Sequence, residues 1–129
     1  MERIDVIIKR SDNGLFLAVP EHNYNVGLHG EGKTSEDAIN DLRVVCREAK
    51  EFCPELPDFE FHVKYEVPGF LLEYGRMFSL AGLSAITGVH QKQLGHYVNG
   101  NSRPSPATAK KIEDAVLKFR STFNQVEFA

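Results

Sequence analysis

The sequence predicts an α+β fold of two modules, a strand-rich one at residues 1–67 and an all-helical one at residues 69–129. Two patterns favour this division. Apolar and polar residues alternate over several segments of the first module, as in strands with one buried face. In the second module, apolar residues recur every three or four positions, as in amphipathic helices.

The net charge also differs between the two modules. Through Pro68 there are 14 acidic and 8 basic side chains, a net charge of −6, whereas from Gly69 onward 7 basic and 4 acidic side chains give +3. The overall charge of −3 therefore combines an acidic module with a basic one. A basic module approaches phosphates readily, and an acidic one suits a cationic partner.

The first module is predicted to have the order β-β-β-α-β. Alternation indicates strands at residues 4–9 and 15–19, joined by a turn at residues 11–14. Its Asn-Gly pair tolerates the positive φ that tight hairpins need. We expect a loop at residues 20–25 and a third strand at residues 26–30.

A helix follows, capped by Thr34 in a reciprocal arrangement with Asp37 and ended by Pro54. Its apolar stripe comprises Ala38, Leu42, Val45, Cys46, Ala49 and Phe52. Strict alternation over residues 59–67 predicts the fourth strand, and Pro68-Gly69 is expected to close the module.

The two cysteines, Cys46 and Cys53, lie seven residues apart in this helix. A rise of about 1.5 Å per residue separates their backbones by about 10 Å, more than the ~7 Å that a disulfide spans. We therefore expect free thiols in a reducing compartment, and no metal or cofactor. Charged Glu2 and Arg3 follow Met1 at once and no long apolar run occurs, so we expect a cytoplasmic protein with no membrane segment.

The second module is predicted to contain four helices. Helical spacing indicates one at residues 70–78, a second that begins behind Ser79 as its N-cap, and a third after a sharp bend at Gly88. A fourth begins at Ser105. The outer face of the third helix carries hydrogen-bonding and basic residues and no large apolar one.

The stretch from Ser79 through Gly88 to the loop Asn99-Gly100-Asn101-Ser102-Arg103-Pro104-Ser105 resembles the helix-turn-helix of phage-repressor-like (Cro/repressor, Xre-type) DNA-binding domains. That resemblance implies that the second helix of the motif enters the major groove of double-stranded operator DNA. The residues assigned to DNA contact on this basis are Ser79, His90, Gln91, Lys92, Gln93, His96, Asn99, Asn101 and Arg103. The alternative is an ordinary helical hairpin in a bundle.

The first module is similar to the amino-terminal domain of HicB-type antitoxins. The similarity rests on the strand order, the turn before Phe16, Pro20 after the second strand, and the helix start at Gly32-Lys33-Thr34. It implies a partial ribonuclease-H-like fold, neutralisation of a HicA-like, mRNA-degrading toxin, and repression of the chain's own operon. We expect the toxin contact around Phe16, Tyr24 and Tyr65, although Phe16 and Tyr65 serve equally well as core anchors.

Catalysis by the chain itself is not expected. Ribonuclease H chemistry needs three or four carboxylates that converge on two metal ions, whereas Asp12 is a turn residue and Asp37 a helix cap. The apolar stripe of the last helix is longer than the small module can cover. We therefore expect Phe119 and Phe123 to contact a second copy in a homodimer or higher even oligomer. The alternative function is a stand-alone phage-like transcriptional repressor whose first module senses a ligand or a protein.

Overall fold

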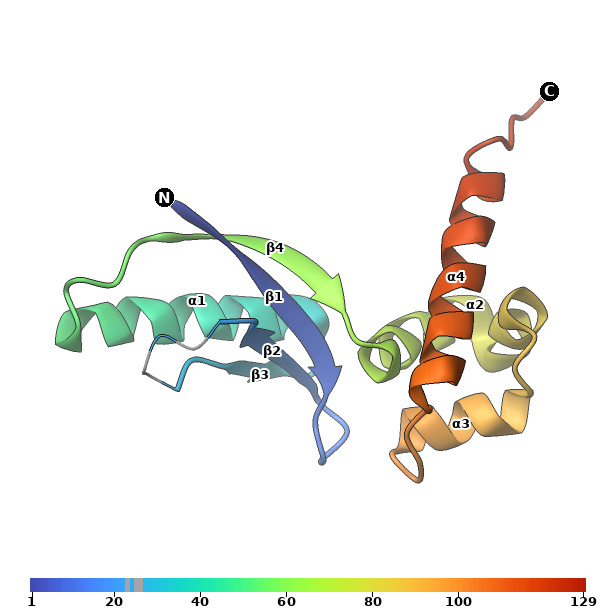
Figure 1. Ribbon diagram of the computed structural model, residues 1–129, viewed down its shortest axis with the longest axis horizontal. Helices are drawn as coiled ribbons and strands as arrows, with labels where there is room; N and C mark the ends of the chain where they lie inside the picture. Colours follow the sequence, from blue (N-terminus) through green and yellow to red (C-terminus); the bar gives the residue numbers. More distant parts are fainter. Residues whose placement is uncertain (23, 25–26) are drawn as a thin grey trace.

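The computed structural model describes residues 1–22, 24 and 27–129 (Figure 1). Its elements, in chain order, are β1 (Glu2–Arg10), β2 (Phe16–Pro20), β3 (Gly30–Gly32), α1 (Ser35–Phe52), β4 (Phe59–Tyr65), α2 (Val67–Thr87), α3 (Gln91–Asn99) and α4 (Pro106–Phe123). A four-stranded sheet with one helix is thus followed by three helices. This is the mixed α+β arrangement that the sequence predicts.

The sheet has the strand order β3-β2-β1-β4, in which β1 is antiparallel to β2 and parallel to β4. The parallel pair requires a crossover, and α1 supplies it while covering one face of the sheet (Figure 1). Alternate residues of β1 point into the core between sheet and helix. The buried apolar residues there are Ile4, Val6, Ile8, Phe16, Ala18, Leu28, Ala38 and Leu42.

Strand β3 is shorter and later than predicted. It spans Gly30–Gly32, and Leu28 is a buried core residue that precedes it. Val26, expected in this strand, lies outside the described residues, as do Asn23 and Asn25 of the expected loop. Gly30 lies so close to α1 that a Cβ would overlap the Ala38 backbone, which explains why the strand begins on a glycine.

The predicted helix cap is present in part: Thr34 Oγ1 accepts a hydrogen bond from Asp37 N at 3.0 Å. Phe52, expected in the apolar stripe of α1, is the last residue of the helix and is 85% exposed. Cys46 and Cys53 are free and half-buried. Burial raises the pKa of the Cys46 thiol.

The ends of two strands, β2 and β4, differ from the predicted ends. Pro20 is not in a loop but ends β2, where it pairs with Val6. The fourth strand ends at Tyr65, two residues early, and Val67 already begins α2. Pro68 and Gly69 lie buried in the first turn of α2, where a proline ring fits because its missing N–H has no partner to lose.

The two helices predicted at residues 70–78 and from Ser79 onward are both present within α2, and they meet at a kink at Ser79. Ser79 has φ 62° and ψ 159°, a conformation that a non-glycine residue adopts only under strain. Its Oγ accepts a hydrogen bond from Gly82 N at 3.0 Å, so it caps the following helical turns as predicted. A second core forms here from Val67, Leu71, Leu83, Val89, Leu94, Tyr97 and Ile112.

Helix α2 belongs to both cores. Leu71 is fully buried in the second core, and its neighbour Leu72 packs against the first. Glu73 accepts hydrogen bonds from Ser35 Oγ at 2.6 Å and from the hydroxyl of Tyr65. The two modules therefore share a helix, while their division into separate domains at residues 1–67 and 69–129 stays a prediction. None of the described helices combines the length and apolar character that a membrane span requires.

Candidate nucleic-acid interface

Helix α3 is defined at both ends by local signals. At its start, His90 Nδ1 accepts a hydrogen bond from Lys92 N at 3.1 Å, the role that serine or threonine plays at other helix starts. The bend before it occurs at Gly88 (φ 74°), and the helix ends at Gly100 (φ 78°). Leu94 and Tyr97 face the core at 0% and 5% exposure, which turns the opposite side of α3 outward.

A shallow hollow of about 440 Å³ runs along this outer side. It is lined by Leu80, His90, Gln91, Lys92, Gly95, His96, Asn99 and Asn101. Six of the nine residues assigned to DNA contact thus lie together. The Asn101 side-chain nitrogen is 3.3 Å from His96 Nδ1, which ties the loop after α3 to the helix. Amide, imidazole and ammonium groups of this kind are those that read base edges and phosphates.

The other three assigned residues lie elsewhere. Ser79 caps a helical segment of α2. Gln93 is half-buried, and its Nε2 donates to Ser102 Oγ at 3.3 Å. Arg103 is 78% exposed in the loop between α3 and α4, with Nη1 3.6 Å from Glu66 Oε1. DNA contact by any of the nine residues stays a prediction, and Gln93 is the one whose amide already has a partner inside the domain.

Arg10 is a residue of this region that sequence reasoning missed. It ends β1 in the first module, yet its guanidinium donates to the backbone carbonyls of Val98 and Asn99 at the end of α3. No local signal marks such a role, since strand alternation says nothing about a partner 88 residues away.

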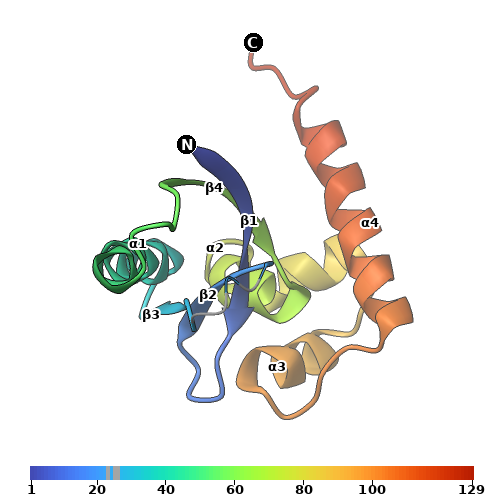
Figure 2. The ribbon, with the colours of Figure 1, turned by 60° about the vertical axis from the view of Figure 1, so that its left-hand side comes forward.

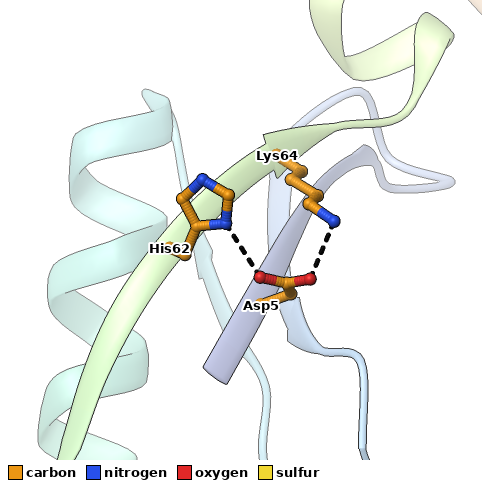
Figure 3. A network of polar contacts seen from close by, with 3 residues as sticks. All are labelled: Asp5, His62 and Lys64. Atoms are coloured by element: carbon orange, nitrogen blue, oxygen red, sulfur yellow. Dashed lines mark hydrogen bonds and ion pairs between the residues drawn. The ribbon is translucent and has the colours of Figure 1, made fainter. Parts of the chain in front are cut away.

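A polar cluster on the sheet includes Asp5, a carboxylate of the module whose similarity implies a ribonuclease-H-like fold (Figure 3). The Asp5 carboxylate is 2.8 Å from Lys64 Nζ and 2.9 Å from His62 Nδ1. Lys64 and then His62 hold the pKa of Asp5 well below its usual range. The carboxylate is thus engaged by two basic groups. Among the described residues, no three histidine, cysteine or acidic side chains are placed to hold a metal ion.

The three aromatic residues assigned to toxin contact do not form one surface. Phe16 is 2% exposed in the first core, which corrects its assignment, because a side chain in the core presents nothing to a partner. Tyr24 packs on Phe59 with ring centroids 5.0 Å apart. Its hydroxyl donates to Glu2 at 2.6 Å, which raises the pKa of Tyr24 to about 12. Tyr65, at the other end of β4, packs against α2.

Comparison with known families identifies the second module. Residues 71–116 match the family model described as helix-turn-helix, a stretch that runs from α2 through α3 into α4. The chain therefore carries a helix-turn-helix domain of the kind found in DNA-binding transcriptional regulators. Comparison with curated proteins and with solved structures gives no match. The HicB-type assignment of the first module gains no support from these comparisons and stays a prediction.

Proposed function

We propose that this protein is a repressor that places α3 in the major groove of operator DNA, and that its first module is the neutralising part of a HicB-type antitoxin. The observation that carries the first half is the polar hollow along α3 within a helix-turn-helix domain. Gln91 offers an amide suited to adenine, and Lys92 reaches guanine or a phosphate. Asn99 and Asn101 extend the same face into the loop.

The test of this half is binding of the full chain to duplex DNA taken from upstream of its own gene. Fluorescence anisotropy is measured against a random-sequence duplex of equal length at one fixed salt concentration. A specific repressor binds its operator at least about 10³-fold more tightly than other DNA. Equal affinity for both duplexes would contradict the proposal.

The second half rests on the charge and the sequence similarity of the first module. Its net charge of −6 is carried largely by exposed acidic side chains, such as Glu36, Glu48 and Glu51 on α1. A HicA-like toxin is a small basic protein that binds RNA. The acidic surface of the first module would attract the cationic face of such a toxin and compete with RNA for that face.

Growth rescue tests this half. The product of a short basic reading frame next to the gene is co-expressed with the full chain, or with a Gln91→Ala/Lys92→Ala double variant altered only on α3. We expect rescue by both, because neutralisation belongs to the first module. Absence of such a reading frame would favour the alternative, a stand-alone phage-like repressor whose first module senses a ligand or another protein.

We also propose that the protein acts as a homodimer. Apolar side chains lie exposed on α2 and α4, with Met77 at 69%, Phe78 at 44%, Leu117 at 49% and Phe123 at 61% exposure. Phe119 packs between Phe78 and Phe123, with centroids 6.1 and 5.8 Å away, so the three rings join the two helices in one apolar surface. Two half-sites about one turn apart would supply the specificity that one short helix lacks.

A further inference from the structure

The β1–β2 hairpin of the first module reaches the end of the helix proposed to enter DNA. Figures 1 and 2 both show the hairpin beside the loop that follows α3. Arg10, the last residue of β1, makes the contact: Nε donates to Val98 O at 2.6 Å, and Nη2 donates to Asn99 O at 3.0 Å. Nη1 donates to Ser11 O at 2.9 Å, which anchors the guanidinium to its own hairpin.

These bonds satisfy a need of α3 itself. The last carbonyls of a helix lack partners within the helix, and they form the negative end of its dipole. A guanidinium there supplies both hydrogen bonds and positive charge. Helix α3 has only nine residues, and helices of that length depend on contacts outside themselves for stability.

Gly100 shows how closely the arginine fits. A Cβ on this residue would lie 2.6 Å from Arg10 Nη1, so the position combines a left-handed backbone (φ 78°) with the space that the guanidinium occupies. The backbone N–H of Asn101 donates to His96 O at 2.9 Å in the same turn. The end of α3, the loop and Arg10 thus pack as one unit.

The junction between β1 and α2 fixes the position of β1 relative to the helix-turn-helix. Gly69, in the first turn of α2, lies against the backbone of Ile8, where a Cβ would overlap the carbonyl oxygen. Ile8 is only two residues before Arg10. The strand that carries the arginine is therefore fixed relative to the helix that precedes α3.

We propose that Arg10 is a positioning residue for α3, through which the first module sets the DNA affinity of the second. The inference rests on the proposed function that α3 enters the major groove. Arg10 acts by holding the last turn of α3 and the loop with Asn99 and Asn101 in place, not by touching DNA. A partner that displaces the hairpin would weaken DNA binding without covering α3.

The experiment compares the full-length chain with Arg10→Ala, Arg10→Lys and Arg3→Ala. Arg3 is exposed near the start of the same strand, so Arg3→Ala controls for the loss of one positive charge. Each protein binds duplex DNA from upstream of its gene, and the dissociation constant is measured over a series of salt concentrations. Hydrogen exchange of the amides of residues 97–102 is followed in the absence of DNA.

We expect Arg10→Ala to lose about tenfold in affinity, equivalent to ~1.4 kcal/mol, with the salt slope unchanged. Arg10→Lys should lose nearly as much, because an ammonium cannot bridge two carbonyls as a planar fork does. Amides 97–102 should exchange faster in both variants, while Arg3→Ala matches the parent chain. Thermal unfolding checks that the variants remain folded. If Arg10→Ala does not fold, the test rests on Arg10→Lys.

Two results would overturn the inference about Arg10 while leaving the proposed function intact. One is parent-like affinity in both Arg10 variants. The other is a salt slope that falls by about 0.9 in Arg10→Ala and returns in Arg10→Lys, since that pattern marks a direct phosphate contact. A parent chain that binds no duplex specifically would overturn the proposed function, and this inference with it.

Discussion

Substitutions on the first turn of α3 separate base reading from phosphate contact. Gln91 and Lys92 are neighbours, both exposed and both lining the hollow along the helix. We expect Gln91→Ala to lose about 1–3 kcal/mol of preference for the operator base that it contacts, because one paired amide contact is removed. Lys92→Ala should weaken binding to every duplex and lower the salt slope by about 0.9, because one released counterion is lost.

Gln93→Ala is the matched control for Gln91→Ala. It removes the same amide from the same helix, but this amide is half-buried and donates to Ser102 Oγ at 3.3 Å. We expect base preference to stay as in the parent chain. The assay is competition anisotropy with operator duplexes changed at one base pair at a time, repeated at several salt concentrations.

Loss of base preference in Gln93→Ala but not in Gln91→Ala would refute this reasoning, because α3 would then present another face to DNA. An unchanged salt slope in Lys92→Ala would show that the first turn of α3 lies away from the phosphates. In that case the hollow along α3 has another role.

Three further predictions concern stability and assembly. Leu94→Ala should lower the free energy of unfolding by about 2–5 kcal/mol in urea titrations, because the Leu94 side chain, on the core-facing side of α3, is fully buried; a smaller loss would mean that the site collapses easily. Because the pKa of Asp5 is lowered in the folded state, its ion pairs stabilise the fold fully above the unfolded value near 3.8, and this stability is lost progressively as the pH falls from there through the lower pKa of the folded state. Asp5→Asn should therefore flatten the acid limb of the stability profile, and an unchanged limb would contradict this. Light scattering should give the mass of two copies for the parent chain and of one for Phe123→Asp, and a monomeric parent would exclude the homodimer.

Features set by a few neighbouring residues were predictable from the sequence. The Asn-Gly hairpin, the Thr34 cap, the capping role of Ser79 and the bend at Gly88 each depend on local backbone conformation and short-range hydrogen bonds. Apolar periodicity also identified α3 and its core-facing residues, because it reports which side of an element is buried. The helix-turn-helix was therefore predictable from the sequence.

Apolar periodicity does not indicate which segment packs against a buried face. The predictions that depended on such tertiary contacts were incomplete. For Phe16 the sequence left a partner contact and a core role equally open, and the structure places it in the core; Gln93 was placed outward but is half-buried and bonds to Ser102. Strand β4 and α2 meet with one residue between them, so Pro68-Gly69 lies inside a helix that packs on the sheet.

The sequence by itself determined the secondary-structure type of each module, most of the turns and caps between elements, and the residues of α3 that face the core. Only the tertiary structure decided that α2 enters both cores and that Arg10 reaches the end of α3 from another module. The reason is physical: caps and turns are stabilised within about four residues, whereas contacts such as Arg10 to Val98 exist only after two distant segments have packed together.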